Sequence, residues 1–167
     1  MEISVSWDLS GFKHENVIEL VAFALNKEGK CKNKTGVVGS MQPWSEIGIS
    51  YEVINRYGVN NENDKCLTIK IEEDKVPYYC KEILLFAYNN NGYKPNCTFE
   101  DLEFFKVFKN DENIYNLSNK NEFTGLFHIC NIVKVNNELN FVSEMKFLNK
   151  DLIKLGQEFD IMFNYQS

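Results

Sequence analysis

Alternation of apolar and polar residues is the feature that most constrains the fold of this chain. Ile3, Val5 and Trp7 alternate with polar residues near the N-terminus. Leu67 to Glu72 repeats this pattern, whereas Ile83 to Tyr88 is apolar throughout. Successive side chains of a β-strand point to opposite faces, so a period of two predicts strands with one buried face. The continuous apolar run predicts a central strand that is covered on both faces.

Further strands are predicted from β-branched and aromatic runs. The segment Ile18 to Lys30 is typical of a buried strand that ends in a tight turn. A helix over Glu15 to Ala24 is the alternative, but the β-branched residues in it favour a strand. The remaining runs rich in these residue types are Leu102 to Phe108, Phe123 to Val135 and Leu139 to Met145.

Turn and cap residues connect these strands. Asn136 and Asn137 stand between two alternating runs, and Lys109 to Asn113 separates two others. Asn tolerates the positive φ angles of tight hairpins, so both are predicted hairpin turns. One helix is predicted over Lys150 to Glu158, with Asn149 as its N-cap. The chain is therefore expected to be all-β, a two-sheet β-sandwich with one short C-terminal helix, forming a single domain over residues 1–167.

Composition excludes several classes of partner. Eighteen basic and 24 acidic residues give a formal net charge of −6, which gives no general attraction to nucleic acid or anionic lipid. No apolar run approaches the roughly 18 residues that a membrane helix needs. The strand pattern begins at once, with no apolar leader. Five cysteines without a Cys-x-x-Cys motif favour reduced thiols, so a cytoplasmic location is expected.

Acidic residues provide the candidate metal site. If the first two strands pair as a hairpin, Asp8 and Glu19 come to the same rim of a sheet. Glu62 and Asp64 lie in the Asn-rich segment from Asn55 to Asp64, which is predicted to be a surface loop. Calcium takes six to eight oxygen ligands, and these four carboxylates are candidate donors. The alternative is that Glu19 sits at a solvated rim and the loop binds nothing.

No catalytic residues are predicted. His14 and His128 are the only histidines, and His128 lies in a strand pattern next to Cys130. Residues two apart on a strand share a face without converging on one atom, so a Cys–His dyad is disfavoured. The sequence contains no nucleophile elbow, phosphate-binding glycine loop or zinc-protease motif. The chain is therefore expected not to be an enzyme.

Several short motifs follow one another over nearly the whole chain: Val5 to Asp8, Glu19 to Lys30, Leu67 to Ile71, Lys75 to Pro77, Ile83 to Tyr88, Phe104 to Phe108, Tyr115 to Leu117 and Asn140 to Phe141. In this order they resemble the tellurium-resistance, TerD-like family of bacterial stress proteins. The resemblance implies a β-sandwich that binds calcium through acidic loops at one end and acts in stress responses. It implies no enzyme activity for the domain.

Three departures from the family pattern leave two functions open. The aspartate run of the family is matched by Asn16 to Glu19, which keeps one acid, and its acidic loop by Asn60 to Asp64, which keeps two. The family's paired-asparagine loop is replaced by Gly39 to Pro43. One hypothesis is a stress protein that binds calcium weakly through Asp8, Glu19, Glu62 and Asp64. The other is a metal-free protein–protein interaction module of the same fold with a degenerate calcium site.

Overall fold

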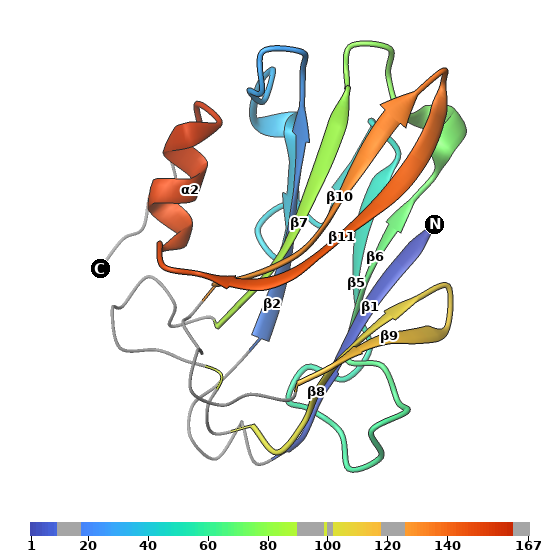
Figure 1. The fold of residues 1–167 in the computed structure, drawn as a ribbon, viewed down its shortest axis with the longest axis vertical. Helices are drawn as coiled ribbons and strands as arrows, with labels where there is room; N and C mark the ends of the chain where they lie inside the picture. The colour runs from blue at the N-terminus through green and yellow to red at the C-terminus, as the bar shows by residue number, and fades with distance from the viewer. Residues whose placement is uncertain (10–17, 90–98, 100–101, 118–125, 162–167) are drawn as a thin grey trace.

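The structure is a computed structural model that describes residues 1–9, 18–89, 99, 102–117 and 126–161. Two antiparallel sheets pack face to face, as Figure 1 shows. The first sheet has six strands, in the order β4 (Trp44–Ser45), β5 (Ile49–Val53), β6 (Leu67–Ile71), β1 (Glu2–Trp7), β8 (Phe105–Lys109) and β9 (Glu112–Asn116). The second has five, in the order β11 (Glu138–Leu148), β10 (Leu126–Val135), β7 (Glu82–Asn89), β2 (Ile18–Leu25) and β3 (Val37–Gly39). The predicted two-sheet sandwich is confirmed.

The main core lies between the two sheets. Ile3, Val5 and Trp7 of β1 point into it and are fully buried, as their alternation predicts. Ile18, Leu20, Ala22 and Ala24 of β2 face the same core from the opposite sheet. Burial of this apolar surface is the main force that holds the sheets together.

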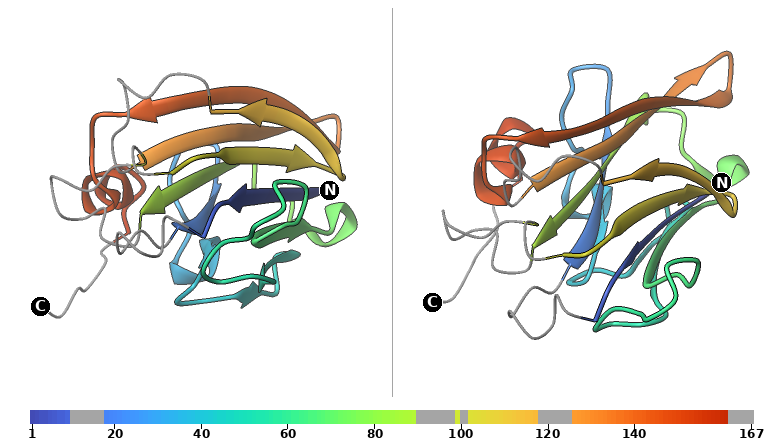
Figure 2. Two further views of the ribbon diagram at one scale, coloured as in Figure 1. Left: turned by 90° about the horizontal axis from the view of Figure 1, so that it is seen from below. Right: turned by 60° about the horizontal axis from the view of Figure 1, so that its bottom comes forward.

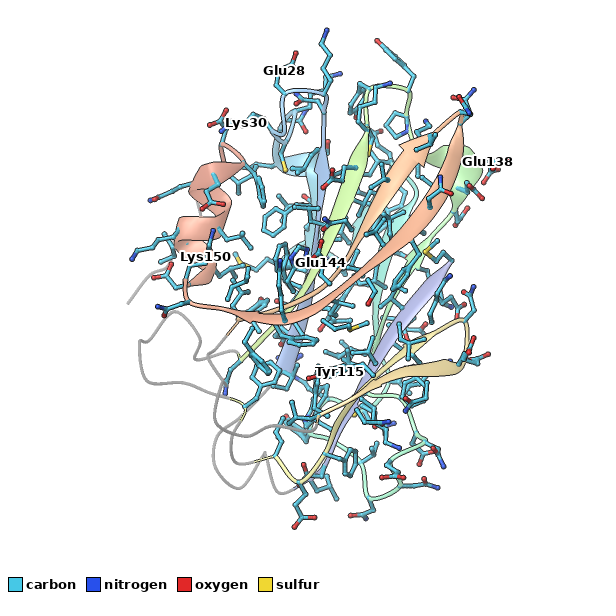
Figure 3. The ribbon with its side chains drawn as sticks, viewed as in Figure 1. Glu28, Lys30, Tyr115, Glu138, Glu144 and Lys150 are labelled. Carbon is cyan, nitrogen blue, oxygen red and sulfur yellow. The ribbon has the colours of Figure 1, made fainter. Side chains whose placement is uncertain are left out.

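A second, smaller core covers the outer face of the five-stranded sheet. Helix α2 (Leu152–Glu158) places Leu152 and Leu155 against Phe23 and Phe86. Strands β2 and β7 are thus buried on both faces, which explains their nearly continuous apolar sequences. Lys30, which Figure 3 labels, lies in the turn after β2 and donates a hydrogen bond to the carbonyl oxygen of Glu158 at 2.5 Å.

The N-cap of α2 differs from the prediction. The helix begins at Leu152, and the side chain of Asp151 accepts a hydrogen bond from the backbone N–H of Lys154 at 2.8 Å. Asn149 lies before the helix and is not its cap. Both residue types suit an N-cap, so the choice depends on where the apolar face of the helix meets the sheet.

The expected pairing of the first two strands is wrong. β1 pairs with β6 and β8, whereas β2 pairs with β3 and β7 in the other sheet. The chain therefore crosses between sheets after β1. Asp8 and Glu19 lie at the same end of the sandwich but on different sheets, because β1 ends and β2 begins there.

Both predicted hairpin turns are confirmed. Asn136 and Asn137 have φ angles of 51° and 64° and join β10 to β11. Asn110 and Asp111 have φ angles of 47° and 70° and join β8 to β9. Asn and Asp adopt this left-handed conformation more readily than other side chains, which is why these positions turn the chain.

Strand β11 forms one outer edge of the five-stranded sheet and is 11 residues long. The backbone N–H of Leu139, near its start, donates to a carboxylate oxygen of Glu73 at 2.6 Å. Glu73 belongs to the short 3₁₀ helix η2 (Glu73–Lys75). Further along, Met145 has a φ of 46°, where the register between β10 and β11 shifts. This edge is therefore capped at one point and kinked at another.

Candidate functional site

All four acids predicted as metal ligands lie at one end of the sandwich. Asp8 directly follows β1, Glu19 is the second residue of β2, and Glu62 and Asp64 lie in the β5–β6 loop (residues 54–66). We call this region, where β1 and β5 end and β2 and β6 begin, the loop end; it is the lower end in Figure 1. Whether the acids form one site depends on which partner each side chain contacts.

Glu19 is buried and neutralised by the protein itself. Its side chain is 2% exposed and one carboxylate oxygen lies 3.1 Å from a guanidinium nitrogen of Arg56. The other carboxylate oxygen accepts a short hydrogen bond from the hydroxyl of Tyr51. An isolated carboxylate at this depth is strongly unfavourable, so these two donors are what make the buried charge tolerable.

The surrounding strands explain how Glu19 reaches Tyr51. The ladder between β2 and β3 covers Val21 to Phe23 and ends there, so β3 does not flank Glu19. Tyr51 lies on β5 of the opposite sheet, and its side chain is part of the main core. The Tyr51 hydroxyl therefore reaches Glu19 from the opposite sheet, at the part of β2 that β3 leaves unflanked.

Arg56 approaches from the β5–β6 loop. The base of this loop is held by the Asn55 side chain, which donates to the carbonyl oxygen of Lys65 at 2.8 Å. The Arg56 side chain remains 44% exposed. It is the only arginine in the chain, and an arginine suits this position because it stays charged when partly buried.

Tyr51 is held in its protonated form. Burial raises the pKa of Tyr51 well above its ordinary value, and the hydrogen bond and charge of Glu19 raise it further. The hydroxyl therefore acts as a donor towards the carboxylate at all ordinary pH values. Glu19, Tyr51 and Arg56 form one hydrogen-bonded unit around the buried carboxylate, which we call the Glu19 cluster.

Asp8 has a different set of partners. It is 5% exposed, and one carboxylate oxygen accepts hydrogen bonds from the backbone N–H groups of Glu103 at 2.8 Å and Phe104 at 3.4 Å. Its backbone bridges to Val59 of the β5–β6 loop. Asp8 thus fastens two neighbouring segments to the end of β1.

Glu62 and Asp64 are exposed on the β5–β6 loop. A carboxylate oxygen of Glu62 lies 3.0 Å from the ammonium of Lys106 on β8. The backbone N–H of Asp64 donates to the carbonyl oxygen of Asn61 at 3.0 Å, within a turn of the loop. Figure 2 shows this loop beside β1 and β8. The described residues include no group of three or more His, Cys, Asp or Glu side chains placed to hold a metal ion.

His128 is packed rather than poised for chemistry. Its ring stacks on Phe86 with 4.5 Å between centroids, and its Nε2 lies 2.6 Å from a side-chain oxygen of Asn131. Asn131 also donates to Glu144, which lies midway along β11 (Figure 3). Burial lowers the pKa of His128. Burial also raises the pKa of Cys130 to about 12, which disfavours a reactive thiolate. His14 lies outside the described residues.

The sequence alone did not predict that Tyr51 and Arg56 complete the environment of Glu19. The one available signal was compositional, since a single arginine stands in a chain whose other basic residues are lysines. Among the residues that the structure describes, no helix has the length and apolar character to cross a membrane.

Comparison with known proteins identifies the fold. No family model and no curated protein matches this sequence. The structure is similar to SCO6318 from Streptomyces coelicolor, a homologue of the telluride resistance protein TerD, with a TM-score of 0.72 and 11% identity over 93% of each chain. It is also similar to SAV2460, a protein of unknown function, with a TM-score of 0.69 and 11% identity over 93% of this chain and 92% of that one. The chain therefore has the fold of a TerD homologue, and the TerD-like resemblance is confirmed at the level of the fold.

Proposed function

We propose that this protein is a non-enzymatic, cytoplasmic binding module of the tellurium-resistance type that acts in a stress response without calcium. The observation that carries the metal-free part is that three of the four candidate ligands already have protein partners. Glu19 pairs with an arginine, Asp8 accepts two backbone N–H groups, and Glu62 pairs with a lysine. Calcium requires several oxygens that converge on one point.

Surface chemistry supports the binding role. Met41 and Trp44 are 79% and 68% exposed; Met41 lies between β3 and β4, and Trp44 is the first residue of β4. Large exposed apolar side chains are typical of protein-binding surfaces when they occur close together. The four described cysteines are buried free thiols, which supports a reducing compartment.

Calcium titration tests the metal-free part. A ligand that binds only the folded state raises stability by about 2.7 kcal/mol at a hundredfold excess over Kd. For a chain of 167 residues this corresponds to a rise in Tm of about 8 °C. We expect equal Tm values in chelator and in millimolar calcium. A saturable rise would instead support the calcium-binding alternative, and Asp64→Asn and Glu62→Gln would then locate the ion.

A growth assay tests the physiological part. We expect expression of the chain in a tellurite-sensitive bacterium to improve growth on tellurite. A Met41→Ser/Trp44→Ser double variant should lose this effect while keeping its Tm, because both side chains are exposed. Tyr78→Ser is the matched control, since Tyr78 is 84% exposed at a different part of the surface. Equal growth with and without the protein would contradict the proposal.

A further inference from the structure

We infer that Arg56 is a built-in counter-ion, whose guanidinium takes the place of a metal ion at Glu19 and fastens the β5–β6 loop to the opposite sheet. The TerD-like resemblance implies calcium at this end of the fold. The surroundings of Glu19 do not fit such an ion, and this disagreement is the basis of the inference. It concerns Glu19 alone and does not depend on the proposed binding partner.

The donor set around Glu19 suits a carboxylate that is already neutralised. Tyr51 donates to one carboxylate oxygen, and Arg56 donates to the other at 3.1 Å. A calcium ion needs further oxygen ligands, yet the neighbouring groups are a hydroxyl that donates its proton and a cationic guanidinium. A divalent cation placed beside Arg56 would be repelled by it.

A second ion pair in the chain shows what is particular to this one. Lys70 and Glu52 lie 3.2 Å apart, with side chains 46% and 53% exposed. In the Arg56–Glu19 pair the distance is 3.1 Å and the exposed fractions are 44% and 2%. The cations are nearly equally exposed and the distances are nearly equal, so the two pairs differ chiefly in the burial of the carboxylate, although Lys70 also lies 3.9 Å from a carboxylate oxygen of Glu2. When the cation is removed, water can hydrate the exposed carboxylate of Glu52 but cannot reach the buried carboxylate of Glu19.

The position of Arg56 gives the pair a mechanical role. Other side chains of the β5–β6 loop contact the six-stranded sheet, since Glu62 pairs with Lys106 on β8 and Lys65 pairs with Asp111 in the β8–β9 turn. Arg56 instead pairs with β2 of the five-stranded sheet. Ionic contacts therefore fasten the loop to both sheets.

Thermal melting of the full chain tests the inference, with Arg56→Met as the main variant and Lys70→Met as the matched control. Each variant is melted once in chelator and then separately in calcium, magnesium or guanidinium at about 10 mM. This guanidinium concentration is far below the denaturing range. We expect Arg56→Met to melt about 5 °C or more below the wild type, and Lys70→Met to melt close to it. Added cations should partly restore the Tm of Arg56→Met and leave the wild type unchanged.

A double variant separates loss of charge balance from loss of shape. Glu19→Gln combined with Arg56→Met removes both charges, so it should melt above Arg56→Met and no longer respond to cations. If Arg56→Met does not fold, folding of the double variant supports the inference, and its failure to fold overturns it.

Two further results would overturn the inference. One is an Arg56→Met protein that melts with the wild type. The other is a calcium-induced rise in the wild-type Tm that Glu19→Gln removes. A calcium-induced rise that Glu19→Gln leaves unchanged would contradict the proposed metal-free function but support the inference, because the ion would then be bound elsewhere.

Discussion

The Tyr51 hydroxyl gives the sharpest test of the buried Glu19 cluster, because Tyr51→Phe removes one oxygen atom and little else. Tyr51 is 8% exposed, and its hydroxyl donates to the carboxylate of Glu19, a residue that is 1% exposed. A hydrogen bond to a charged group contributes about 1.5–3 kcal/mol, and here the acceptor is left unsatisfied in the interior. We therefore expect a loss of about 2 kcal/mol in the free energy of unfolding.

This loss converts into a measurable shift in melting temperature. An unfolding entropy of about 2.1 cal/mol/K per residue gives about 0.35 kcal/mol/K for 167 residues. A loss of about 2 kcal/mol then lowers Tm by about 6 °C, as followed by calorimetry or circular dichroism. Tyr78→Phe is the control, because Tyr78 is 84% exposed and its hydroxyl faces solvent. A Tyr51→Phe protein that melts with the control would refute the buried hydrogen bond.

The same hydroxyl predicts a dependence on alkaline pH. The pKa of Tyr51 in the folded protein lies above its ordinary value of 10.0. Above pH 10 the folded state therefore holds a proton that the unfolded state has lost, so stability falls as the pH rises. The fall in Tm above pH 10 should be less steep in Tyr51→Phe than in Tyr78→Phe. Equal slopes would show that Tyr51 ionises normally.

Three further predictions concern other parts of the molecule. Asp151→Ala should lower the free energy of unfolding by about 1 kcal/mol in urea titrations, whereas Asn149→Ala should change it by less than about 0.5 kcal/mol, because only the former caps α2. Gly58→Ala should cost more than about 2 kcal/mol, since φ is +100° and the new Cβ would lie 2.7 Å from a backbone oxygen. Gly29→Ala, with φ of +74° in open space, should cost about 1 kcal/mol, and equal losses would argue against the clash. His128 has a lowered pKa, so its unfolded form takes up a proton first and stability should fall as the pH drops below 6.5. His128→Gln should flatten that slope, and an unchanged slope would place the titration elsewhere.

The larger strands could be predicted from the sequence because their signal is local. Alternation marked β1 and β6, and the continuous apolar run marked β7 as a strand with two buried faces. The two-residue β4 and three-residue β3 were not predicted, since runs this short carry no periodicity. The five-residue β5 was not predicted either. β8 begins at Phe105 rather than at Leu102, and the first residues of the predicted Phe123 to Val135 strand lie outside the described part.

Sheet membership could not be predicted in the same way. A hairpin between β1 and β2 was the simplest interpretation of two neighbouring strands. Whether two strands pair or cross between sheets depends on contacts with strands far along the chain, such as β6 and β8 for β1. This information is absent from a local pattern of apolar residues.

The candidate site was predictable only in part. A carboxylate on the apolar strand β2 indicated that Glu19 needs a special partner. The partner proved to be Arg56, which is 37 residues away in sequence and on a loop. A cation supplied by the chain itself leaves no periodic pattern in the sequence. Composition and spacing therefore could not distinguish an internal cation from an external metal ion.

The outer edge of β11 affects how the protein behaves when it is concentrated. A long unpaired strand is a template on which further molecules can add by backbone hydrogen bonding. The carboxylate of Glu73 accepts the hydrogen bond of the Leu139 amide, and Met145, with its positive φ, lies where the register with β10 shifts. These two features oppose the addition of a further strand along β11, the longest strand in the described part of the chain.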